Sequence, residues 1–79
     1  DKKYLQRNAA LAIGNYGDTE YAPILFETLE THPEEIVRCA AARSLGKLKV
    51  TKGMDKFLAD PSLSVQKAVN SAFEDSERC

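Results

Sequence analysis

Apolar and small residues recur along the chain at the spacing of one helix face. The same five-position spacing, i, i+4, i+7, i+8 and i+11, fits three segments, the third of them at four positions. The three sets are Leu5, Ala9, Ala12, Ile13 and Tyr16; Val37, Ala41, Ser44, Leu45 and Leu48; and Val65, Val69, Ala72 and Phe73. This spacing is that of an amphipathic α-helix. The sequence therefore predicts three similar helices, each burying the same face.

These sets follow one another at a nearly fixed interval. Val37 lies 32 residues after Leu5, and Val65 lies 28 residues after Val37. A period in this range is typical of helical repeat proteins. Shorter apolar clusters between the sets predict a second type of helix, one over Tyr21–Leu29 and one around Met54. The apolar residues of these short helices are Ile24, Leu25, Leu29 and, at the edge, Phe26; and Met54, Phe57 and Leu58.

The repeat predicts an all-α fold of five helices in A-B-A-B-A order, with no strand. We expect one domain over residues 1–79, with units at about 4–31 and 32–59 and a capping helix at 60–79. Asp60 and Pro61 form a favourable N-cap and first-turn pair for the last helix. Pro23 is tolerated if it lies in a first turn. Gly14 and Gly46 share one repeat position, which we interpret as a helix end with positive φ.

Composition is that of an ordinary globular domain, with 43% hydrophobic and 29% charged residues. No apolar run has the length of a membrane span, and no signal-peptide pattern opens the chain. Cys39 and Cys79 lack any spacing pattern, so we expect free thiols in a cytoplasmic protein, with a disulfide between them as the alternative. Because the chain starts within a repeat helix and turns polar after Phe73, we expect the C-terminal segment of a longer protein.

The net charge of −1 hides an uneven distribution. Residues 17–37 contain six acidic side chains but no Lys or Arg, whereas residues 38–56 contain six Lys or Arg side chains and only Asp55 as an acid. The candidate cationic patch consists of Arg43, Lys47, Lys49, Lys52 and Lys56. Such a patch suits phosphate contacts. The alternative is a solvated helix face.

Chemistry-bearing residues are few in this segment. His32 is the only histidine, and two cysteines are too few for a four-thiolate cluster. We therefore predict no catalytic or metal site here. Arg7 is expected to be exposed and to contact phosphate or a carboxylate of the 18–20 turn. Asn8 borders the apolar stripe, and its amide is expected to tie a neighbouring loop or helix end, with nucleic-acid contact as the alternative.

The pattern V-R-x-x-A-A-x-A-L-G resembles the short HEAT-like repeats of phycobilisome-lyase type. Val37-Arg38, Ala41-Ala42 and Leu45-Gly46 match it, and Ser44 departs from the usual Ala. The resemblance covers nearly the whole chain and implies an α-α superhelix. It also implies a structural role for Arg38, packed between units and paired with an acidic or carbonyl group.

A second resemblance rests on Leu5-Gln6-Arg7-Asn8-Ala9-Ala10 and the following Asn15-Tyr16-Gly17-Asp18. This stretch is similar to the C-terminal HEAT-like region of bacterial epoxyqueuosine reductases and related iron–sulfur proteins. It implies an upstream catalytic domain with [4Fe–4S] clusters and cobalamin, and a tRNA anticodon stem-loop as partner. The nucleic-acid contacts would be Arg7, Asn8, Arg43, Lys47, Lys49 and Lys52. The alternative function is a protein–protein interaction scaffold.

Overall fold

The computed structural model describes residues 2–77. Its elements are α1 (Lys2–Tyr16), η1 (Thr19–Tyr21), α2 (Ala22–Thr31), α3 (Glu35–Lys47), η2 (Met54–Ala59) and α4 (Leu63–Glu77). No β-strand occurs between residues 2 and 77. The all-α prediction is confirmed, and the five predicted helices are α1, α2, α3, η2 and α4. The fourth is a 3-10 helix, and η1 adds one turn ahead of α2.

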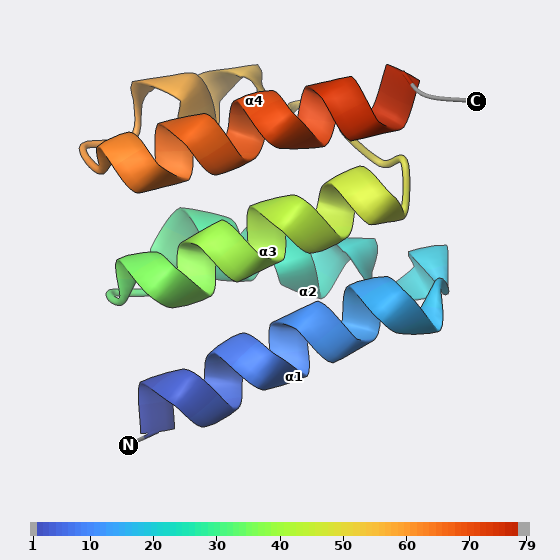
Figure 1. The fold of residues 1–79 in the computed structure, drawn as a ribbon, viewed down its shortest axis with the longest axis horizontal. Helices are drawn as coiled ribbons and strands as arrows, with labels where there is room; N and C mark the ends of the chain where they lie inside the picture. The colour runs from blue at the N-terminus through green and yellow to red at the C-terminus, as the bar shows by residue number, and fades with distance from the viewer. Residues whose placement is uncertain (1, 78–79) are drawn as a thin grey trace.

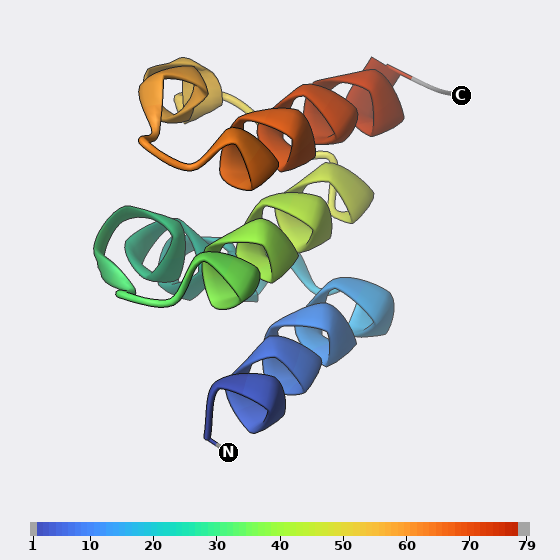
Figure 2. The same ribbon diagram turned by 60° about the vertical axis from the view of Figure 1, so that its left-hand side comes forward.

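The helices form two layers (Figures 1 and 2). The long helices α1, α3 and α4 lie side by side in that order and run in the same direction, and we call them the long-helix layer. The short-helix layer consists of α2, which packs on α3, and η2, which packs on α4. Each short helix thus packs on the long helix that follows it in sequence, whereas the unit boundaries expected from the period group α1 with α2.

The repeated apolar positions are buried in the second and third long helices. In α3, Val37 is 1% exposed and Leu45 is fully buried, and in α4 both Val65 and Val69 are fully buried. The short helices complete this core with further apolar side chains. These are Leu25, Leu29, Met54 and Phe57. The predicted core therefore exists around α3 and α4.

The same positions of α1 are not buried. Leu5 is 71% exposed and Tyr16 is 74% exposed, and α1 instead buries Ala10 and Gly14 against α3. The expectation of an equivalent buried face in α1 is therefore wrong. The reason is that α3 and α4 each carry a short helix, whereas no short helix among residues 2–77 covers α1. Ile24 of α2, at 55% exposure, is likewise more open than its apolar character predicts.

Gly14 and Gly46 lie inside helices, so the prediction of a positive φ at these positions is wrong. The glycines with positive φ are Gly17 and Gly53, in the loops that follow α1 and precede η2. Gly14 and Gly46 are buried at contacts between long helices. A Cβ atom at Gly46 would lie 2.6 Å from the Cα of Ala72. These two glycines serve close helix packing and not chain reversal.

The start of α4 also differs from the prediction. The helix begins at Leu63, and the preceding Ser62 accepts from the backbone N–H of Val65 through its hydroxyl, at 3.4 Å. Asp60 is therefore not the N-cap, and Pro61 does not lie in the first turn. The carboxylate of Asp60 instead accepts from the guanidinium of Arg38 and from the backbone N–H of Ser62. Pro23, by contrast, lies in the first turn of α2 as predicted.

Candidate functional site

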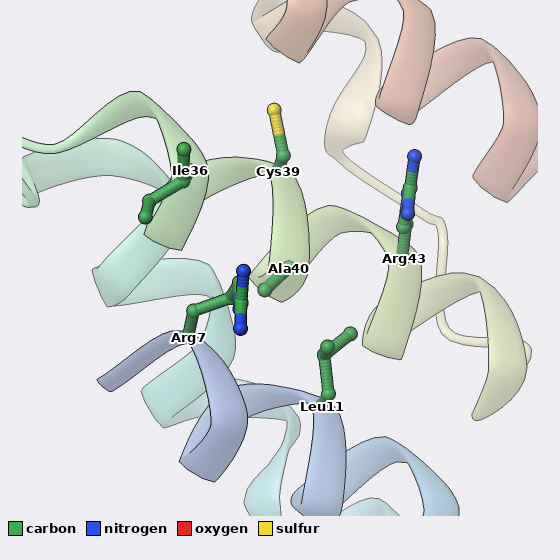
Figure 3. Close-up of a pocket in the computed structure, with 6 residues that line it drawn as sticks. All are labelled: Arg7, Leu11, Ile36, Cys39, Ala40 and Arg43. Atoms are coloured by element: carbon green, nitrogen blue, oxygen red, sulfur yellow. The ribbon is translucent and has the colours of Figure 1, made fainter. Parts of the chain in front are cut away.

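A pocket of about 200 Å³ opens between α1 and α3 (Figure 3). Helix α1 contributes Arg7 and Leu11, and α3 contributes the remaining side chains. The residues from α3 are Ile36, Cys39, Ala40 and Arg43. An apolar floor with arginines at its two ends is an arrangement that can hold an anionic group next to an apolar one.

Neither arginine of this pocket forms an ion pair with a carboxylate in the part of the chain that the structure describes. Arg7 donates from Nε and Nη2 to the Asn8 side-chain oxygen, at 3.2 and 3.1 Å, and lies 5.3 Å from the centre of the Tyr4 ring. Arg43 is exposed and forms no hydrogen bond or ion pair with any residue between 2 and 77. A guanidinium has five N–H donors. Both arginines therefore retain donors for an external acceptor.

Cys39 is a free thiol at the same pocket and is partly buried. Burial raises the pKa of the Cys39 thiol, because the thiolate would lose solvation, and the neighbouring positive charge of Arg43 offsets only part of this effect. The thiol is therefore neutral at physiological pH. Cys79, its candidate partner in a disulfide, lies outside the described residues.

Among the described residues, Asn8 does not form the expected tie to a neighbouring loop or helix end. Asn8 is exposed, and from residues 2–77 its side-chain oxygen accepts only the hydrogen bonds of Arg7. Arg7 in turn does not reach the 18–20 turn, where Asp18 accepts from the backbone N–H of Glu20 at 2.9 Å. Arg7 is half-buried, and not exposed as expected, because its side chain points toward α3 at the pocket (Figure 3).

The predicted cationic patch is divided among three places. Arg43 and Lys47 lie on α3, and Lys47 donates to the Asn15 side-chain oxygen of α1 at 2.6 Å. Lys49 and Lys52 lie in the loop between α3 and η2, where Lys49 adopts a φ of 59°. Lys56 lies in the short-helix layer and pairs with Glu30 of α2 at 3.4 Å. The single patch is therefore wrong, since Lys56 belongs to the opposite layer.

The sequence-based list of candidate contacts omitted Lys67, a basic residue of the long-helix layer. Lys67 of α4 lies 28 residues after Cys39, which itself lies 32 residues after Arg7. The repeat thus places Lys67 in register with two residues of the pocket, and it is exposed. The repeat interval, when it is applied to polar as well as apolar positions, identifies Lys67.

Arg38 has the structural role that the repeat pattern implied. Its Nε and Nη2 donate to the two carboxylate oxygens of Asp60, both at 3.3 Å, and its Nη1 donates to the carbonyl oxygens of His32 and Pro33 at 2.8 and 3.2 Å. The side chain is 14% exposed. It therefore joins the α2–α3 turn to the η2–α4 turn and has little capacity left for a ligand.

Comparison with known proteins agrees with this architecture. A family model of HEAT repeats matches residues 1–73. No curated protein and no solved structure matches the chain. Within residues 2–77, no helix is long and apolar enough to cross a membrane. Because the family model covers nearly all of the two-layer helical array, the chain belongs to the HEAT repeat family.

Proposed function

We propose that this chain is a non-catalytic binding module whose long-helix layer contacts the phosphate groups of a nucleic acid. The observation that carries the proposal is the placement of Arg7 and Arg43 at one pocket, where neither pairs with a carboxylate of residues 2–77. Guanidinium groups match phosphate oxygens by donating two parallel hydrogen bonds. Lys47 extends the positive row along α3.

The distribution of acidic residues supports this orientation. Several carboxylates belong to η1, α2 and η2, on the side of the short-helix layer. They are Glu20, Glu27, Glu30 and Asp55. A polyanion approaching these helices meets like charge, whereas at the pocket it meets two arginines that pair with no carboxylate of residues 2–77. The field of the molecule therefore favours the long-helix layer for such a partner.

The specific form of the proposal is contact with a tRNA anticodon stem-loop, as part of an epoxyqueuosine reductase-like protein. Its support is the stretch Gln6-Arg7-Asn8-Ala9-Ala10, since Arg7 of this stretch lies at the pocket. The two cysteines of this chain do not supply the four thiolates of a [4Fe–4S] cluster. Clusters and cobalamin would accordingly be held by another domain, and no chemical step is assigned to these residues.

Titration of a fluorescent RNA stem-loop with the protein tests this function. We expect binding to weaken about tenfold or more in Arg43→Glu and in Arg7→Glu, because each change removes a phosphate contact and adds repulsion. Lys56→Glu is the matched control, with the same change in charge placed in the short-helix layer. Equal losses in all three variants, or affinity that does not fall with added salt, would refute the proposal.

A protein-interaction scaffold is the second candidate. The observation in its favour is the set of exposed apolar side chains on α1 and α2, which includes Leu5, Tyr16 and Ile24. Exposed apolar surface of this kind marks protein contacts. Under this candidate the stem-loop shows no salt-dependent binding, so the same titration separates the two functions.

A further inference from the structure

Successive long helices meet through a glycine placed over a small residue. A Cβ atom added at Gly14 of α1 would lie 2.7 Å from the Cα of Ser44 in α3, and one added at Gly46 of α3 would lie 2.6 Å from the Cα of Ala72 in α4. Ser44 and Ala72 are both fully buried. The two contacts between long helices are therefore built in the same way.

The repeat gives α1 a small residue at the receiving position of this contact. Gly46 lies 32 residues after Gly14, and Ala72 lies 28 residues after Ser44. Ala12 lies 32 residues before Ser44, so it is the α1 equivalent of Ser44 and Ala72. Ala12 is exposed, since no helix among the described residues lies over it. Ala12 of α1 is thus suited to contact a glycine of a neighbouring helix, and no such helix is present among the described residues.

The surface around Ala12 has the character of a helix interface. Leu5 and Tyr16 are 71% and 74% exposed, whereas their equivalents in α3, Val37 and Leu48, are 1% and 7% exposed. Two adjoining hollows follow this side of α1 and share Ile13. The first, of about 200 Å³, is lined by α1 and α2, and the second reaches Tyr21. In Figures 1 and 2, α2 covers α3 and η2 covers α4, and the corresponding place on α1 is open.

We propose that this face of α1 is the interface for one more two-helix repeat of the same type, joined ahead of α1 in the same polypeptide. Its long helix lies beside α1 with a glycine over Ala12. Its short helix occupies the open place in the short-helix layer, against Leu5 and Ile13. The proposal continues the interface already present between α1 and α3 and between α3 and α4.

A second copy of this chain does not fit the face by stacking end to end. The residue of α4 that corresponds to Gly14 and Gly46 is Glu74, which lies 28 residues after Gly46 and is exposed. A glutamate there holds the backbones apart and brings a charge to an apolar contact. The helix that covers Ala12 therefore comes from a repeat with its own glycine.

Duplication of residues 1–32 ahead of residue 1 tests the proposal in the full chain. The insert reproduces the natural interval of 32 residues, so its Gly14 falls over the original Ala12. We expect the extended chain to melt about 5 °C or more above the natural chain, because neighbouring repeats stabilise each other through their interfaces. We also expect amide protons of the original α1 to exchange more slowly.

A matched set of Ala12→Leu variants gives the control. In the extended chain, Leu at the original Ala12 displaces the glycine contact and removes the gain in Tm. The same change in the natural chain, or in the added copy, shifts Tm by less than about 1 °C because the position is exposed. Equal effects at all three places, or an extension without any gain, would overturn the proposal. Dimerisation of the natural chain that Ala12→Arg abolishes would also overturn it, by assigning the face to a second copy.

Discussion

Arg38 and Asp60, 22 residues apart in sequence, are joined by two parallel hydrogen bonds of 3.3 Å. The guanidinium also binds the carbonyl oxygens of His32 and Pro33. One side chain thus holds two interhelical turns in a fixed relation. Since the side chains of Arg38 and Asp60 are only 14% and 9% exposed, the pair is screened by solvent much less than a surface ion pair.

We expect Arg38→Ala to lower the free energy of unfolding by about 2–4 kcal/mol, because it removes two of the donors to the Asp60 carboxylate and the side-chain donor to two carbonyl groups. Urea denaturation measures the change. Lys56→Ala is the control, since the exposed pair with Glu30 contributes about 0.5 kcal/mol or less. A loss for Arg38→Ala no larger than that of the control would contradict the structural role.

Gly46→Ala tests the close contact between α3 and α4. Alanine favours an isolated helix by about 1 kcal/mol over glycine. Here we expect a net loss of about 1–3 kcal/mol, because the new methyl group collides with the backbone of Ala72. Thermal unfolding monitored by circular dichroism is the measurement. Gly14→Ala should behave in the same way against Ser44, and stabilisation by either variant would show that the helices can separate freely.

Ser44 donates a hydrogen bond to the carbonyl oxygen of Ala10 in α1, at 2.5 Å. We expect Ser44→Ala to cost about 0.5–1.5 kcal/mol, the usual net value of such a bond. Alanine fits the space and leaves no buried hydroxyl unpaired, so a larger loss is not expected. Urea denaturation of Ser44→Ala beside an exposed control, Ser71→Ala, measures the difference. No loss would indicate that the bond is not formed in solution.

Cys39 should react slowly with iodoacetamide, which requires the thiolate. Because burial raises the pKa of its thiol, the midpoint of the pH–rate profile should lie above that of an ordinary cysteine. Because the pKa is raised in the folded protein, the protonated thiol contributes stability below the ordinary thiol pKa. This contribution is lost as the pH rises from the ordinary pKa through the raised pKa of the folded protein. Alkylation of a Cys79→Ser variant, followed by mass spectrometry, isolates Cys39. A pH midpoint of alkylation at or below that of free cysteine would contradict the partial burial of Cys39.

Arg43→Gln provides a second test of the surroundings of Cys39. The positive charge of Arg43 lowers the thiol pKa and offsets part of the effect of burial. Removing that charge should move the alkylation midpoint further upward. A downward movement would show that the guanidinium does not face the thiol.

The sequence predicted both the helix and its buried face correctly for α3 and α4, the long helices that carry a short helix. The intervals between Leu5, Val37 and Val65 identified three long helices, and the Val-Arg pattern identified Arg38 as structural. The prediction failed at α1 because the interval specifies a face but not the presence of a covering helix. It failed at Gly14 and Gly46 because a glycine near a helix end is compatible both with a turn and with close packing.

The candidate site was less accessible from sequence. Arg7 and Arg43 lie 36 residues apart, and only the side-by-side packing of α1 and α3 brings them to one pocket. The five basic residues of the predicted patch, all within residues 38–56, were expected to lie together because they are close in sequence. In the structure, the chain passes from the long-helix layer to the short-helix layer within that segment.

By itself, the sequence determined the all-α class and the repeat interval, because helix periodicity and repetition are local properties of the chain, and its resemblance to HEAT-like repeats implied the pairing role of Arg38. The tertiary structure alone decided that α2 packs on α3, that two glycines lie over Ser44 and Ala72, and that Ala12 remains uncovered. Burial depends on which neighbour occupies a face. That neighbour is fixed by packing between distant segments, which no local pattern specifies.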